Sequence, residues 1–285
     1  MATALSTSWP SVQIARALLA AASASLALWI LAYGHLAPQP LPAWTPWRGI
    51  WVYGSAVLLL AATFGLCVTR TVIPSILTVA AYLAADAAIS VPQIVARPLG
   101  IDAWYPFCES LTPLAGAWTL FILLRMRPPG SGTRIDGEVT VRIARVLFGL
   151  TCVFYGVSHF AYAGYTASMV PGWLPNRLVL AYITGTCHIA AGLALIVGIQ
   201  PRLAATLEAA MMSAFGALVW VPSFFTYPRP SWATPPEQQW SELVVTLVLA
   251  MGAWIVAISL ADRPWAASAR VRAGRLRPPS GHSPR

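Results

Sequence analysis

The sequence predicts an all-α integral membrane protein whose eight transmembrane helices form two parallel tandem four-helix-bundle repeats. Three observations support this prediction. First, 58% of the 285 residues are hydrophobic and only 9% are charged, whereas soluble domains are about 25% charged. Second, eight apolar segments have the ~17–25 residues needed to cross a hydrocarbon core. Third, landmarks of the first half recur in the second.

The eight segments all share the length and composition of membrane spans and lie near residues 14–33, 49–67, 72–91, 107–124, 143–162, 178–198, 203–221 and 241–260. Lipid offers no hydrogen-bond partners, so each must be a helix or a strand of a closed barrel. Because the apolar runs show no period-two alternation, we predict helices. The first segment resembles a signal peptide. It matches the internal segment 143–162, however, and should be retained.

The duplication rests on three landmarks that recur in the same order. They are a Pro-Trp-Pro-Arg loop, a Val-Pro pair and a glutamate, found at residues 42–48 and 171–177, Val91-Pro92 and Val221-Pro222, and Glu109 and Glu242. A shift of 129 to 133 positions relates all of them. Since each copy has an even number of spans, the copies are parallel rather than inverted.

The repeat sets the expected domain boundaries. We predict a diverged first repeat, a Pro- and Gly-rich cytoplasmic linker, a second repeat and a basic disordered cytoplasmic tail, at residues 1–125, 126–141, 142–262 and 263–285. The tail is interpreted first as a determinant of topology. Attraction of its arginines to anionic lipid is the alternative.

The basic residues, all 18 of them arginine, are distributed unevenly. Fourteen fall in the N-terminus, the even-numbered connections and the tail, against four in the opposite loops. This bias predicts that both termini are cytoplasmic. The net charge of +9 therefore lies beside the membrane. It does not indicate a nucleic-acid partner, because a basic face would be needed for that.

His188 is the most informative single residue. It follows Arg177 by 11 positions, which places it ~16 Å into the membrane. Ionisable groups at that depth are costly and usually face the protein interior. Thr184, Gly185 and Gly192 share its helix face, and the small residues would allow a neighbouring helix to approach closely.

Glu208 is the expected partner of His188, since a tight hairpin makes their two helices antiparallel neighbours. We expect Glu208 about one turn nearer the cytoplasm, where a water bridge is easier than direct contact. The functional interpretation is a site that binds a ligand or a proton. The structural alternatives are a hydrogen-bonded helix clamp or a glutamate that reaches the inner interface. In the first repeat, the corresponding positions are about Leu59 and Thr78.

A second group of polar residues lies near the outer ends of the helices. A hypothetical outer vestibule would contain His159, Tyr155, Glu242 and Trp173, with His35 and Glu109 beside them. Tyr33-Gly34-His35 is the first-repeat match expected for the motif Tyr155–Phe160, so His35 is expected to correspond to His159. Ordinary interfacial polarity is the favoured alternative, because polar groups cost little at that depth. No short metal-ligand motif occurs, so no metal site is predicted. In the first repeat, the acidic residue expected inside the membrane is Asp86.

The cysteines and tryptophans have plain and functional interpretations. No Cys-x-x-Cys motif occurs, but Cys152 and Cys187 both lie near mid-membrane. They could form a redox pair, or they could be small packing residues, which are commoner.

Eight of the 13 tryptophans fall near the outer loops. An interfacial aromatic belt explains them best, and a lid over a lateral opening is the alternative.

The second repeat resembles the DoxX family of small four-helix membrane proteins. The resemblance rests on segments Phe148-Gly149, Tyr155–Phe160, Val170–Pro175, Thr184–Leu195, Pro201–Ala205 and Ser259–Asp262, together with Glu242. The family usually has Glu where this chain has His188. The resemblance implies a bacterial or archaeal membrane protein linked in some members to sulfur or quinone redox systems.

These observations lead to two function hypotheses and leave enzymatic activity undecided. The leading one, from the resemblance, is a multi-pass protein of the bacterial cytoplasmic membrane that is a quinone-contacting or non-catalytic subunit of a redox or detoxification complex. Its partner would be a membrane or peripheral oxidoreductase, and quinone its only suggested cofactor. The alternative is a transporter or binder of protons or a small hydrophobic ligand in the second bundle, around His188, Met211, Met212 and Phe215.

Overall fold

The computed structural model describes residues 9–36, 40–125, 134–228, 230–233 and 236–265. The longer helices are α1 (Trp9–Tyr33), α2 (Arg48–Cys67), α3 (Val72–Ala96), α4 (Ile101–Arg125), α5 (Arg134–Ala161), α7 (Arg177–Val197), α8 (Pro201–Phe215) and α10 (Pro236–Ser259). The short elements are α6 (Ala163–Met169), a π-helical turn (Gly216–Trp220), α9 (Val221–Ser223) and a 3₁₀ turn (Ser231–Ala233). These described residues contain no strand, so the all-α prediction is confirmed.

Eight helical segments are long and apolar enough to cross a membrane, as predicted. The seventh is composite, because α8 continues through the π-helical turn and α9 to Ser223. One boundary differs from expectation: α5 begins at Arg134, within the predicted linker. Proline, which lacks a backbone N–H and ends helices, does not occur between Pro129 and Pro171. Residues 126–133 and most of the predicted tail lie outside the described residues.

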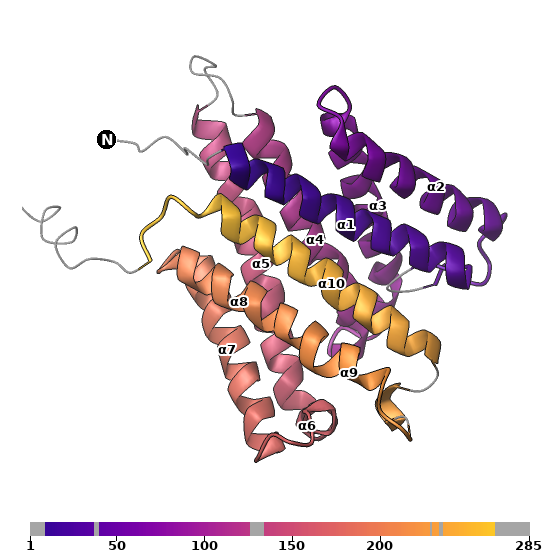
Figure 1. Ribbon diagram of the computed structural model, residues 1–285, viewed down its shortest axis with the longest axis vertical. Coiled ribbons are helices and arrows are strands. Elements are labelled where there is room, and N and C mark those ends of the chain that lie inside the picture. Colours follow the sequence, from indigo (N-terminus) through magenta and orange to yellow (C-terminus); the bar gives the residue numbers. More distant parts are fainter. Residues whose placement is uncertain (1–8, 37–39, 126–133, 229, 234–235, 266–285) are drawn as a thin grey trace, which may run out of the picture.

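The two repeats pack through their fourth helices. Figure 1 shows α10 between α1 and α8, so that the last helix of the second repeat lies against the first helix of the first. Correspondingly, α4 packs against α5 as well as α3, and α4 and α10 contact each other at the centre. Each fourth helix contacts the first helix of the other repeat more than that of its own. The repeats therefore share a continuous interface.

The helix starts define the alignment of the repeats. Both α2 and α7 begin with arginine, at Arg48 and Arg177, and α3 and α8 begin at Val72 and Pro201. Both pairs are 129 positions apart, from 177 − 48 and 201 − 72. We call the end of the molecule that contains the α2–α3 and α7–α8 connections the basic end. The opposite end is the loop end.

Glycines set the closest helix contact, which joins α5 to α7. A Cβ added to Gly192 would lie 2.5 Å from the carbonyl oxygen of Gly149, and one added to Gly156 would lie 2.6 Å from that of Gly185. The two glycines on each helix are seven residues apart and therefore share a face. Only residues without a side chain allow the backbones to approach this closely.

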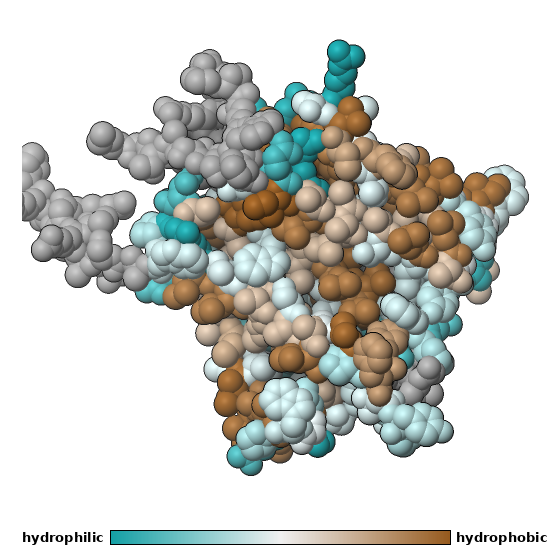
Figure 2. Space-filling model, viewed as in Figure 1, coloured by the Kyte–Doolittle hydropathy of each residue, from teal (hydrophilic) through white to brown (hydrophobic). Residues whose placement is uncertain are grey.

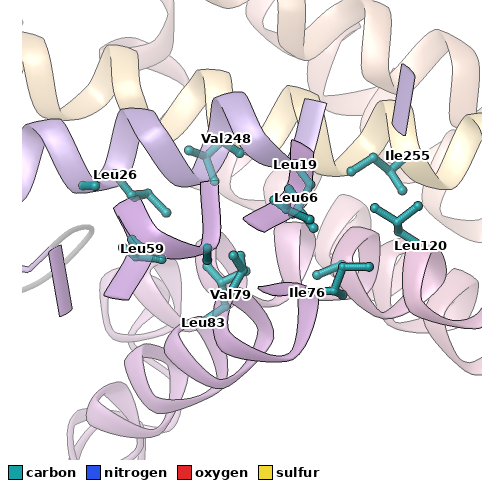
Figure 3. Close-up of a cluster of buried hydrophobic side chains, with 14 of the residues drawn as sticks. Leu19, Leu26, Leu59, Leu66, Ile76, Val79, Leu83, Leu120, Val248 and Ile255 are labelled. Carbon is teal, nitrogen blue, oxygen red and sulfur yellow. The ribbon is translucent and has the colours of Figure 1, made fainter. Parts of the chain in front are cut away.

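In the first repeat, the corresponding interior is aliphatic. Figure 3 shows Leu26, Leu59, Val79 and Leu83 pointing toward one another between α1, α2 and α3. Leu59 is fully buried, and Val79 and Leu83 are almost so. Among the described residues, those packed around Leu59 in this cluster are aliphatic.

The surface is that of a lipid-facing protein. Figure 2 shows apolar side chains across the middle of the displayed face and hydrophilic ones gathered mainly at its rims. Large aromatics are exposed near the loop end, among them Trp44, Trp47 and Trp173, with relative exposures of 82%, 77% and 72%. Such exposed placement supports an aromatic belt in the headgroup region.

The glycine contact predicts that Gly192→Ala destabilises the protein. The added methyl group would overlap the Gly149 carbonyl, and overpacking of this kind costs about 1–3 kcal/mol. Gly54→Ala is the matched control, since a Cβ there meets nothing within 4 Å. Thermal unfolding of both variants in detergent should show a lower Tm for Gly192→Ala only. Equal Tm values would contradict the close α5–α7 packing.

Candidate functional site

The second repeat buries a histidine and a glutamate in direct contact. His188 on α7 is 2% exposed and Glu208 on α8 is fully buried. Nδ1 of His188 lies 2.5 Å from Oε1 of Glu208, so the imidazole and the carboxyl group share a hydrogen bond. The expected partnership is correct, and the contact is direct rather than through water.

Backbone geometry explains why the pair forms. Gly198 ends α7 with φ of +77°, and Gln200 precedes α8 with φ of +46°, so the chain reverses within a few residues. Glycine adopts such left-handed angles without strain. His188 is ten residues before Gly198, whereas Glu208 is eight after Gln200. The two side chains thus differ in depth by a few ångströms only, which their own length spans.

His159 extends the pair toward the loop end. Its ring centroid lies 5.0 Å from that of His188, and its Nδ1 lies 3.0 Å from Oγ1 of Thr184. Phe215 packs against both imidazoles, with centroid distances of 5.9 Å and 5.8 Å. His159 is half-buried, His188 buried and Glu208 fully buried. We call these three residues the His–His–Glu ladder.

The ladder lies in the interior of the membrane. A Cβ on Gly185, ~12 Å along α7 from the loop end, would lie 2.8 Å from the Cβ of His159, and His188 lies ~16 Å along the same helix. Glu208 lies ~10 Å from the start of α8 at the basic end. The ionisable groups are therefore arranged in order from the loop end toward the basic end.

Glu208 retains an unused acceptor. Its Oε2 atom is buried and has no hydrogen-bond partner among the described residues. The buried thiol of Cys152 on α5 adjoins the same carboxylate. A buried carboxylate oxygen without a donor is energetically unfavourable.

The first repeat has an aliphatic residue at each ladder position. A shift of 129 relates His159, His188 and Glu208 to Ile30, Leu59 and Val79, each at most 1% exposed. Val79 is one residue beyond the expected Thr78, which is only half-buried; the helix starts give the more accurate alignment. Folding of a bundle of this kind therefore does not require the ladder.

The expected outer vestibule forms only in part: Tyr155 interacts electrostatically with Glu109, which interacts with Glu242, whereas Trp173 is exposed. Tyr155 is buried, with its ring centroid 6.1 Å from that of His188. Met212 is buried one turn after Glu208 on α8. Trp173 is exposed on the loop before α7. The vestibule was inferred from depth alone, which does not fix the direction in which each side chain points.

Glu242 belongs instead to the junction between the repeats. It interacts electrostatically with Glu109, its counterpart in the first repeat, and Glu109 interacts with Asp86. Asp86 is buried and accepts a hydrogen bond of 2.6 Å from the Ser110 hydroxyl. Outside the spans, burial raises the pKa of Tyr165, and the nearby negative charge of Glu242 raises it further. The junction is thus acidic near the loop end.

His35 does not match His159 in the structure. It follows the end of α1 and forms an ion pair with Glu237 at the start of α10. Its ring also contacts Trp29 edge-on, with centroids 4.4 Å apart. By the shift of 129, His159 corresponds to Ile30. His35 therefore joins the two repeats at the loop end and is separate from the ladder.

The cysteines do not form a pair. Cys152 is buried in the α5 interior, whereas Cys187 is exposed on the surface of α7, and both are free thiols. Their different faces support the packing interpretation over a redox pair. Within the described ranges, no group of three or more His, Cys, Asp or Glu residues could hold a metal ion.

A family model matches part of the second repeat. Residues 148–257 match the model of a family described as a domain of unknown function, DUF8561. The match falls within the second repeat and includes all three ladder residues. No curated protein and no solved structure matches the chain. The resemblance to the DoxX family stays a prediction.

The ladder predicts strongly non-additive stability effects. His188→Leu, which introduces the first-repeat residue, leaves Glu208 buried and unpaired, and should cost about 3–5 kcal/mol. His188→Leu/Glu208→Val recreates the first-repeat pair and should be more stable than His188→Leu alone. Urea unfolding in mixed micelles measures the wild type, both single variants and the double variant. Additive losses from the single variants His188→Leu and Glu208→Val would show that the contact is not formed.

Proposed function

We propose that the second repeat takes up and transfers protons across the membrane through the His–His–Glu ladder. One observation carries the proposal: a buried, directly bonded His188–Glu208 pair occupies a position where the first repeat has Leu59 and Val79. Ionisable residues inside a membrane are costly, and chains of His and acidic residues are typical of proton relays. The aliphatic first repeat shows that this cost is not required for folding.

The chemistry of each residue suits this role. A neutral imidazole has one donor and one acceptor nitrogen, so it can accept a proton on one side and release another on the opposite side. His159, half-buried toward the loop end, exchanges protons with water or the headgroup region. His188 receives the proton from His159, 5.0 Å away between ring centroids, after rotation of either ring. Glu208 then accepts it at Oε1 and would release it to water toward the basic end, ~10 Å away along α8.

The direction of transfer follows from the proposed orientation. The excess of arginine at the basic end supports an orientation with that end and both termini in the cytoplasm. The loop end then faces outward, and we propose that the membrane is the cytoplasmic membrane of a bacterium. The ladder leads inward, from His159 to Glu208. A membrane potential that is negative inside would drive protons in that direction.

Contact with a quinone in a redox complex is a second proposal, derived from the DoxX resemblance. The observation that favours it is the stacking of Phe215 on His159, at an interplanar angle of 28°. An aromatic face beside an imidazole could receive a planar, hydrogen-bonding headgroup. Extraction of the protein purified from native membranes, followed by mass spectrometry, would detect such a quinone. The proton proposal requires none.

Proton flux into proteoliposomes tests the first proposal. The full chain is reconstituted with a pH-sensitive dye inside, and a potassium gradient with valinomycin sets the interior negative. Wild-type protein should acidify the interior faster than empty liposomes do. His188→Leu and Glu208→Gln should each slow this flux by about 100-fold, the contribution typical of one positioned proton-transfer group.

His35→Gln is the matched control, because it removes a histidine that pairs with Glu237 outside the ladder. Its flux should equal that of the wild type. Reconstituted amounts are compared by gel density. If wild-type liposomes acidify no faster than empty ones, or if His188→Leu carries wild-type flux, the proposal is wrong.

A further inference from the structure

The two repeats use an equivalent arginine at the basic end in different ways. In the first repeat, Arg16 is buried and donates from Nε and Nη2 to the carbonyl oxygen of Leu66, at 3.0 Å and 2.6 Å. Its Nη1 donates to Oε1 of Gln13, at 3.1 Å. Each of its three nitrogens therefore has an acceptor within the protein.

Arg145 occupies the same position in the second repeat, 129 residues later. Its guanidinium likewise lies at the end of the second helix of its repeat, where a Cβ on Gly198 would be 3.1 Å from Nη1. Its Nε, however, is buried and has no hydrogen-bond partner among the described residues. Arg142 replaces the acceptor Gln13 at the corresponding position. An arginine has no acceptor atom and repels its neighbour instead.

Two further arginines complete a cluster at this end. Arg263, after α10, acts electrostatically on Arg145 together with Arg142. Arg202, at the start of α8, donates to the carbonyl oxygen of Arg263 at 3.2 Å and stacks on Trp265 at 3.9 Å. None of the four arginines takes part in an ion pair among the described residues, and the adjacent Asp262 is exposed.

We propose that Arg142, Arg145, Arg202 and Arg263 form a phosphate-binding site. Arginine donors match the oxygens of a phosphate group, and a bound anion would relieve the repulsion among these side chains. The cluster lies at a membrane boundary beside a tryptophan, where lipid headgroups are present. The phosphate of an anionic phospholipid is therefore the expected occupant. Free phosphate offers the same chemistry.

Native mass spectrometry of the full chain in a nonionic detergent tests the site. The protein is titrated separately with phosphatidylglycerol, with zwitterionic phosphatidylcholine and with inorganic phosphate. The wild-type protein should keep phosphatidylglycerol bound when the detergent is removed in the gas phase. It should lose most of the phosphatidylcholine under the same conditions. Arg142→Gln, which restores the first-repeat acceptor, should weaken phosphatidylglycerol binding about five-fold, the effect expected for one arginine near a membrane surface.

Arg177→Gln is the matched control, because it removes one exposed arginine from the opposite end of the same bundle. Its phosphatidylglycerol affinity should equal that of the wild type. If millimolar inorganic phosphate displaces the lipid, the phosphate-binding site is supported and free phosphate is its occupant. Equal affinities of wild type and Arg142→Gln, or no preference for phosphatidylglycerol over phosphatidylcholine, would overturn the proposal. Thermal melts confirm that both variants are folded.

Discussion

The hydrocarbon core contains no water that could satisfy a polar side chain, and this constraint determines how the second repeat is built. His188 and Glu208 each lie where an unpaired polar group would be unfavourable, and each supplies the hydrogen bond that the other needs. The close approach of α5 and α7 through their glycines brings His159 beside His188. Helix packing and the ionisable site thus depend on each other.

The duplication separates what folding requires from what function requires. The first repeat has the same helix order and fills its interior with aliphatic side chains. The second repeat has three ionisable groups in its interior. At the equivalent positions the first repeat has the aliphatic residues Ile30, Leu59 and Val79. Loss of apolar burial at these positions destabilises a bundle unless hydrogen bonds offset it. Such an unfavourable exchange is typical of functional residues in membranes.

Sequence patterns predict most of the fold, because hydrophobic length and the repeat are both one-dimensional signals. Eight spans and the buried face of Gly185, His188 and Gly192 are confirmed. Hairpin geometry also predicts correctly that Glu208 is the partner of His188. The central positions of α4 and α10 were not predictable, since the duplication does not reveal which helices meet between the copies.

The predicted site was less accurate where it depended on side-chain direction. Tyr155 and His159 are four residues apart, so they share one face of α5, and this spacing could have placed both beside α7. Depth alone instead grouped His159 with Glu242. The correspondence between His159 and His35 fails because the matched tyrosine motifs lie at different distances from the arginines Arg16 and Arg145. Alignment from helix starts corrects it.

The central claim is that the proton between His188 and Glu208 is mobile rather than fixed in a structural clamp. Solid-state ¹⁵N NMR of histidine-labelled protein in lipid bilayers observes the imidazole nitrogens directly. His188→Leu identifies the resonances by their disappearance. We expect the ring N–H protons of His188 to exchange with bulk water, so that their signals are lost when the bilayer sample is transferred to D₂O. Ring N–H protons of His188 that stay protected from exchange would contradict the account.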